Sequence, residues 1–181
     1  MSAVRVAIAG ASGRMGRALL EAATATEGVA LASALDIAPG SWGGMEVGTD
    51  VAGALRVADV LVDFTRPEGT LTHLRACREA GRGLVIGTTG FDAAQLAEIR
   101  AAASRIPIVM APNMSVGVNV SLKLVELAAR ALGPDYDVEV FEMHHKLKVD
   151  APSGTALKLG EVAAAARGAT LERDGVFARH G

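Results

Sequence analysis

A regular alternation of short apolar runs with amphipathic stretches constrains this chain more than any other feature. The amphipathic stretches carry apolar residues at helical spacing, and the runs between them have the length of buried strands. This alternation is typical of βαβ units, which build a parallel sheet with helices on its faces. The expected strands are Val4–Ala9, Val29–Leu35, Val60–Phe64, Leu84–Ile86 and Pro107–Met110.

The expected helices of this first region are Arg14–Ala25, Pro67–Ala80 and Ala93–Ser104. Pro67 suits a first helical turn, and Asp92 is a suitable N-cap. The glycine-rich stretch 39–44 is expected to be a loop. We therefore predict an α/β fold with a doubly wound parallel sheet in residues 1–115.

A second domain of α+β character is expected over residues 116–181. Val116–Leu132 fits a long helix that ends at Gly133, and Gly154–Ala166 fits a second helix. Val138–Met143 fits a strand, and Val176–Ala178 is a shorter candidate strand.

Composition excludes several classes of protein. Half of the 181 residues are apolar and the net charge is −2, which is typical of a compact folded protein. No basic excess points to nucleic acid, and every apolar run is too short to span a membrane. The one cysteine, Cys77, follows Leu71 and Leu74 at helical spacing and is expected to be a buried, inert thiol. Without a signal-peptide pattern at the N-terminus, the expected location is the cytoplasm.

A glycine-rich turn lies between the first strand and the first helix. Glycines there permit a tight turn and let the backbone approach a pyrophosphate, which the start of the helix attracts. Asp36, at the end of the second strand, lies where a carboxylate accepts hydrogen bonds from an adenosine ribose, although it also suits the start of a loop. The turn and Asp36 together predict a Rossmann-like dinucleotide-binding domain. The residues of the turn are Gly10, Ala11, Ser12, Gly13, Arg14, Met15 and Gly16.

Two further loops follow expected strands and should open on the same crevice, because ligands of such sheets bind beyond the carboxyl ends of the strands. Their hydroxyl and main-chain amide groups suit a nicotinamide ribose and carboxamide. One consists of Gly87, Thr88, Thr89 and Gly90, and the other contains Ala111, Pro112, Asn113 and Met114.

A cluster of polar residues precedes the second helix of the second domain. His144, His145 and Lys148 lie just before Ser153, Gly154 and Thr155, where the helix begins. The cations and the start of the helix together predict a pocket for a substrate that carries carboxylates. A metal site made of His144, His145 and Asp150 is a weaker alternative, because adjacent histidines are poorly spaced ligands and no cysteine is near. Lys148 as an ordinary surface lysine is another alternative.

The paired motifs GASGRMG and EMHHKLKVDAPSGTA closely resemble the 4-hydroxy-tetrahydrodipicolinate reductase (dihydrodipicolinate reductase) family, and the similarity covers essentially the whole chain. The resemblance implies reduction of a cyclic dicarboxylic imine to tetrahydrodipicolinate, in lysine and diaminopimelate biosynthesis, with NADH or NADPH. It implies that His144 is a proton donor or acceptor and Lys148 a proton donor. It also implies that His145, Gly154 and Thr155 bind the substrate carboxylates, and that residues 10–15, Asp36 and residues 87–89 and 111–114 bind the cofactor.

Three matters stay open at the level of sequence. Ile37 stands where some family members have an arginine for the 2′-phosphate of NADP, so Asp36 favours NAD without deciding the choice. Family members continue beyond Gly181 and form homotetramers, so we expect the second domain to be incomplete at its C-terminus and the complete protein to be a homotetramer. A non-catalytic dinucleotide-binding module or sensor is the alternative function.

Overall fold

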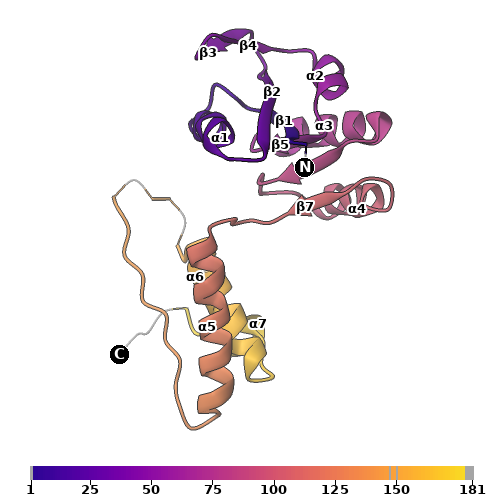
Figure 1. Cartoon of the computed structure of the whole chain (residues 1–181). Helices are drawn as coiled ribbons and strands as arrows, with labels where there is room; N and C mark the ends of the chain where they lie inside the picture. The colour runs from indigo at the N-terminus through magenta and orange to yellow at the C-terminus, as the bar shows by residue number, and fades with distance from the viewer. Residues whose placement is uncertain (1, 147, 150, 178–181) are drawn as a thin grey trace. The chain divides into compact units, whose positions relative to one another are not determined.

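The computed structural model describes residues 2–146, 148–149 and 151–177. The chain divides into two compact units, Met1–Pro112 and Asn113–Gly181, named unit 1 and unit 2 below. The described strands all belong to unit 1, whereas the described elements of unit 2 are all helices (Figure 1).

Within the described residues, unit 1 is built on a seven-stranded sheet with the order β3-β4-β2-β1-β5-β6-β7. All neighbouring strands are parallel except for β3 and β4, which are antiparallel. This order, with β1 in the middle and crossovers to both sides, is that of a Rossmann-like doubly wound sheet. The strands are β1 (Val4–Ala9), β2 (Val29–Leu35), β3 (Gly40–Trp42), β4 (Met45–Gly48), β5 (Val60–Asp63), β6 (Gly83–Ile86) and β7 (Ile108–Met110).

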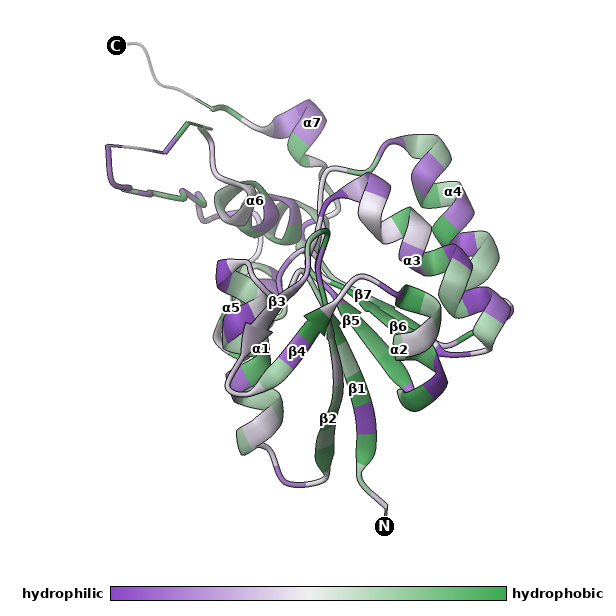
Figure 2. Cartoon of the chain, turned by 90° about the horizontal axis from the view of Figure 1, so that it is seen from above, coloured by the Kyte–Doolittle hydropathy of each residue, from purple (hydrophilic) through white to green (hydrophobic). Residues whose placement is uncertain are grey.

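Helices cover both faces of this sheet (Figure 2). On one face, α1 (Arg14–Ala25) packs Leu20 against β1 and β2. On the other face, α2 (Val51–Val57), α3 (Pro67–Ala80) and α4 (Ala93–Ala102) cover the central strands and form the larger apolar core. Apolar residues on both faces of the strands explain why the runs in the sequence are nearly continuous. The expected α/β fold is confirmed.

The last residues of five neighbouring strands form one row across the sheet. Ala9 pairs with Leu35 on one side and with Asp63 on the other, Asp63 pairs with Ile86, and Ile86 pairs with Met110. The residues that come next in the chain therefore leave the sheet along one edge, which is where ligands of doubly wound sheets bind. These next residues are Asp36, Gly10, Phe64, Gly87 and Ala111.

The prediction of a loop over residues 39–44 is wrong, because most of these residues belong to a short β-hairpin. β3 and β4 are joined by Gly43 and Gly44, whose φ angles of 53° and 85° suit a two-residue hairpin turn. The helix α2 was not expected either. Its start is stabilised by the Asp50 side chain, which accepts a hydrogen bond from the Gly53 N–H.

Unit 2 contains α5 (Val116–Leu132), α6 (Gly154–Ala166) and the short α7 (Leu171–Asp174); α5 packs against α6, and α6 against α7. The expected strand Val138–Met143 is wrong: these residues have no regular secondary structure and pair with no strand in the described part of the unit. Phe141 and Met143 are 91% and 85% exposed. Of the strand expected at 176–178, the first two residues are irregular and Ala178 lies outside the described residues. The described chain has no helix that is both long and apolar enough to cross a membrane.

Candidate functional site

The glycine turn after β1 is built for a close approach of backbone to ligand. Gly10 has a φ angle of +76°, which favours glycine, and a Cβ at Gly16 would lie 2.0 Å from the Gly10 carbonyl oxygen. Gly13 is the N-cap of α1 and forms no side-chain cap, so no side chain competes for the first N–H groups of the helix. A hollow of ≈ 470 Å³ opens here, lined by Gly10, Gly13, Arg14, Met15, Gly16 and Phe64.

Asp36 reaches this turn from the end of β2. Its Oδ2 accepts a hydrogen bond from the Ser12 N–H (2.8 Å), and its Oδ1 accepts one from the Ile37 N–H (2.7 Å). Partial burial opposes ionisation, but these N–H groups outweigh it and lower the pKa of Asp36. The Ile37 side chain is 99% exposed. Asp36 is thus an ionised acceptor beside the turn, as an adenosine ribose requires.

Phe64 is a lining residue to which the sequence analysis assigned no role. It follows Asp63 at the edge of the sheet, and its ring lies against Gly87, where a Cβ would come within 2.0 Å of the ring atom Cε1. The absence of a side chain at Gly87 therefore gives the ring its place. Its position at the carboxyl end of a buried strand, close to where Gly10 lies on the first strand, is the signal that could have identified it.

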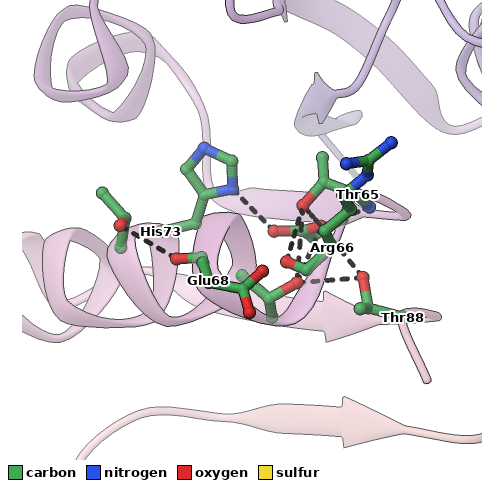
Figure 3. A network of polar contacts seen from close by, with 8 residues as sticks. Thr65, Arg66, Glu68, His73 and Thr88 are labelled. Carbon is green, nitrogen blue, oxygen red and sulfur yellow. Dashed lines mark hydrogen bonds and ion pairs between the residues drawn. The ribbon is translucent and has the colours of Figure 1, made fainter. Parts of the chain in front are cut away.

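Thr88 joins a buried network of polar contacts around Asp63 (Figure 3). The Asp63 carboxylate is fully buried and contacts His73, Thr65, Thr70 and Thr88. Burial alone would raise the pKa of Asp63, but the hydrogen bonds from His73 and Thr65 and the electrostatic interaction with His73 lower it overall. His73, to which the sequence pattern assigned no role, thus has a buried carboxylate partner.

Cys77 lies close to this network and is fully buried. Burial, together with the negative charge of Asp63, raises the pKa of the Cys77 thiol to about 12. A thiol that stays protonated at neutral pH is a poor nucleophile, which agrees with the expected inert cysteine.

The remaining predicted cofactor residues lie around the start of α5. Ala111 is half-buried, and its N–H donates to the Ile86 carbonyl oxygen (3.3 Å), which places the beginning of this loop on the sheet edge. Asn113 accepts a hydrogen bond from the Ser115 N–H (2.9 Å) through its side chain. Pro112, Asn113 and Met114 are exposed. Asn113 and Met114 belong to unit 2.

In unit 2, Glu142 connects His144 with the start of α6. The Glu142 carboxylate accepts hydrogen bonds from the Ser153 N–H (2.8 Å) and from the Ser153 hydroxyl, and it lies 2.8 Å from Nε2 of His144. Ser153 is the N-cap of α6 and accepts from the Ala156 N–H. The Ser153 hydroxyl, His144 and the Ser153 N–H together lower the pKa of Glu142 to about 2. Glu142 thus ties His144 to the helix start at Gly154 and Thr155.

The other predicted substrate residues lie in the same irregular segment. The Lys148 N–H donates to the His145 carbonyl oxygen (3.1 Å), which closes a turn. His145 is exposed and Lys148 half-buried, while Gly154 and Thr155 are exposed at the helix start. Asp150, from the alternative metal site, lies outside the described residues. Among those that are described, no group of three or more histidine, cysteine or acidic side chains could hold a metal ion.

We expect Glu142 to make the stability of unit 2 depend on pH. A carboxyl whose folded pKa is about 2 stabilises the folded state fully above its ordinary value of 4.5 and loses that effect as the pH falls towards 2. The variant Glu142→Gln should therefore unfold at a lower urea concentration than the parent at pH 7, and this difference between the two unfolding midpoints should become smaller by pH 2.5. Urea titrations followed by circular dichroism measure both midpoints. Glu161→Gln removes a charge from the same region as a matched control, and a difference that grows in acid would contradict the assignment.

The sheet order, the glycine turn and the acceptor at Asp36 define a Rossmann-type nucleotide-binding protein. Residues 4–114 match the family described as dihydrodipicolinate reductase, N-terminus, and residues 117–179 match its C-terminal counterpart. The chain belongs to the dihydrodipicolinate reductase family.

Two curated relatives are close. This chain is 53% identical to the 4-hydroxy-tetrahydrodipicolinate reductase of Dechloromonas aromatica (strain RCB). The alignment is 193 positions long and covers 100% of this chain and 72% of the relative. Identity is 56% to the protein of the same name from Thiobacillus denitrificans, with 98% of this chain and 71% of the relative covered. The chain therefore spans about 70% of the length of these relatives.

A solved structure agrees with this family assignment, and a second one shows the shared fold. A dipicolinate-bound dihydrodipicolinate reductase from Paenisporosarcina sp. TG-14 matches with a TM-score of 0.74 and 31% identity, over 91% of this chain and 67% of that one. A protein from gentamicin A biosynthesis in complex with NAD matches with a TM-score of 0.58 and 19% identity, over 69% of this chain and 39% of that one, and shows a shared fold.

Proposed function

We propose that this chain reduces 4-hydroxy-tetrahydrodipicolinate to tetrahydrodipicolinate in lysine and diaminopimelate biosynthesis, using NADH or NADPH. The reaction adds one hydride and one proton to the substrate framework and releases one molecule of water. The observation that carries the proposal is the match of both halves of the chain to one reductase family. It is supported by the loops of unit 1 that leave the sheet along one edge, at the carboxyl ends of neighbouring strands.

Unit 1 supplies the cofactor residues in this proposal, except for Asn113 and Met114 at the beginning of unit 2. The N–H groups at the start of α1 bind the pyrophosphate, and Asp36 accepts hydrogen bonds from the adenosine ribose. Residues 87–89 and 111–114 bind the nicotinamide half. When bound, the reduced nicotinamide supplies the hydride. The hollow beside Phe64 and the bare glycine backbone provide the space for this approach.

Unit 2 supplies the substrate residues. The N–H of Gly154 and the hydroxyl of Thr155, at the positive end of the α6 dipole, bind one carboxylate of the substrate. His145 binds the other carboxylate. Hydride delivery leaves negative charge on the reacting framework, which a nearby acid must neutralise. Lys148 provides this proton and attracts the dianionic substrate, and His144 donates or accepts a proton.

A steady-state assay tests the proposal. The purified 181-residue protein is mixed with freshly generated substrate and with NADH or NADPH, and cofactor oxidation is followed by absorbance at 340 nm. Oxidation that depends on substrate supports the proposal. Binding of NADH without any turnover would instead support a non-catalytic dinucleotide-binding module or sensor.

We expect Asp36→Asn to shift cofactor preference towards NADPH. The Asp36 carboxylate accepts hydrogen bonds from the ribose of NADH and repels the additional phosphate of NADPH. Removing its charge therefore weakens the binding of NADH and favours the binding of NADPH. The ratio of kcat/KM for NADH to that for NADPH should fall about tenfold, the effect of losing one charge-assisted hydrogen bond. Glu46→Gln, an exposed charge removal on β4, is the control and should leave the ratio unchanged. A ratio that stays constant in Asp36→Asn removes Asp36 from the ribose site.

The family resemblance also supports a homotetramer located in the cytoplasm, which we include in the proposal. Light scattering after size-exclusion chromatography measures the mass of the particle directly. A monomeric mass for the complete protein at micromolar concentration would contradict the tetramer.

A further inference from the structure

Beyond the residues assigned to the cofactor, unit 1 contains a buried acidic group that the proposed reaction does not use. Asp63 is the last residue of β5 and has no exposed surface. Burying a carboxylate is costly unless hydrogen bonds and an opposite charge compensate for it. His73 Nδ1 lies 2.6 Å from Oδ2 of Asp63, and the other oxygen, Oδ1, accepts from Thr65 through both its N–H (2.8 Å) and its hydroxyl (2.7 Å).

The same Oδ1 atom connects to the loop after β6. The Thr70 hydroxyl lies 3.1 Å from Oδ1 and 2.9 Å from Oγ1 of Thr88, and Thr88 Oγ1 lies 3.3 Å from Oδ1. Each threonine hydroxyl has one proton, so Thr70 and Thr88 either both donate to Oδ1, or one of them donates to the other, which in turn donates to Oδ1. In every arrangement the carboxylate fixes the Thr88 side chain, directly or through Thr70.

Thr88 is the anchor of its loop. It is 5% exposed, whereas its neighbours Thr89 and Gly90 are exposed, and within the described chain no side-chain hydrogen bond is observed at either of them. On the other side of the network, Thr65 lies against the glycine turn: a Cβ on Gly10 would be 3.1 Å from Thr65 Cγ2. The network thus connects two loops of the sheet edge, and His73 and Thr88 approach it from opposite sides (Figure 3).

We infer that Asp63, with Thr70 and His73, is a positioning residue that fixes the loop of Thr88 in its cofactor-binding conformation. The inference rests on the proposed role of this loop in binding the nicotinamide half of the cofactor. A preset loop loses less conformational entropy when the cofactor binds, so breaking the network weakens binding without removing any group that contacts the cofactor.

Thr70 offers a sharp test, because two substitutions separate its hydroxyl from its volume. Thr70→Val keeps the shape and removes the hydroxyl, whereas Thr70→Ser keeps the hydroxyl and removes a buried methyl group. Thr70→Val should raise the dissociation constant for NADH about fivefold, the effect of one hydrogen bond, and Thr70→Ser should stay within about twofold of the parent. Thr70→Ser should nevertheless lower the Tm by a few degrees, roughly the effect of one lost methyl group.

Fluorescence titration of the 181-residue protein with NADH measures these constants, and Thr72→Val is the matched control. Thr72 is exposed on the same helix, and its hydroxyl donates to the Glu68 carbonyl oxygen of that helix. A double-mutant cycle completes the test: in a Thr88→Val background, Thr70→Val should change the dissociation constant by less than about twofold, because both act through one anchor.

Three results would overturn the inference while leaving the reductase proposal intact: parent-like binding by Thr70→Val, equal weakening by Thr70→Ser, or an undiminished effect of Thr70→Val in the Thr88→Val background. If the parent protein itself binds neither NADH nor NADPH, the proposed function fails first. That outcome appears in the parent titration before any variant is measured.

Discussion

Replacing Lys148 with alanine is expected to lower kcat by about two to four orders of magnitude, which is the usual scale for the loss of a general acid. The ammonium group donates the proton that neutralises the developing negative charge. It also attracts a doubly charged substrate, so KM should rise together with the fall in kcat. Steady-state kinetics with saturating NADH measure both parameters.

Two controls separate chemistry from folding in this experiment. Lys158→Ala removes an exposed lysine on α6 whose ammonium pairs with Glu161 (2.9 Å), and it should leave kcat unchanged. Ethylammonium added to Lys148→Ala should restore part of the lost rate if the missing proton donor is the cause. An unchanged kcat in Lys148→Ala would remove this residue from the mechanism.

Gly16→Ala is expected to lower both stability and cofactor affinity, although helix propensity alone predicts the opposite. Alanine is favoured over glycine inside a helix by about 1 kcal/mol. The new Cβ, however, would lie 2.0 Å from the Gly10 oxygen and 2.7 Å from the Ala11 Cα, and these backbone atoms have little freedom to move. The steric effect should win and lower the free energy of unfolding by about 1–3 kcal/mol, as overpacking does elsewhere.

Displacement of the turn should also raise the dissociation constant for NADH by at least about tenfold, because the pyrophosphate needs a close approach to the backbone. Urea unfolding and NADH titration measure the two effects separately. Gly48→Ala on β4 is the control: a Cβ there meets nothing within 4 Å. If Gly16→Ala were as stable as the parent, the backbone of the turn would be able to move away from the new Cβ, and the prediction would be wrong.

The sequence predicted the elements whose pattern is local. The bounds expected for β1, α1, β2, α3, α5 and α6 agree with the structure. Each of these elements combines a clear apolar period with a glycine, proline or capping residue at an end, so the local and the global preferences agree. The hairpin of β3 and β4 was missed because two glycines can build either a loop or a tight turn, and pairing with β2 decides between them.

The failures depend on partners that are distant in sequence. Residues 138–143 have an apolar pattern that suits a strand, but a strand requires a neighbour, and the described part of unit 2 offers none. The Asp63 network was missed for a related reason: Asp63 and Thr88 are 25 residues apart and meet only when β5 pairs with β6. One signal was present, since Thr70 and His73 are three residues apart and share a face of α3. The roles of His144, His145, Lys148, Gly154 and Thr155 remain predictions.

The two outermost strands described in unit 1, β3 and β7, are three residues long each. An outermost strand leaves a row of unpaired N–H and carbonyl groups, onto which a foreign chain can add as a further strand. Edge strands of three residues offer too few unpaired N–H and carbonyl groups to template amyloid-like growth. Unit 1 should therefore resist strand-mediated aggregation even though its central strands are almost wholly apolar.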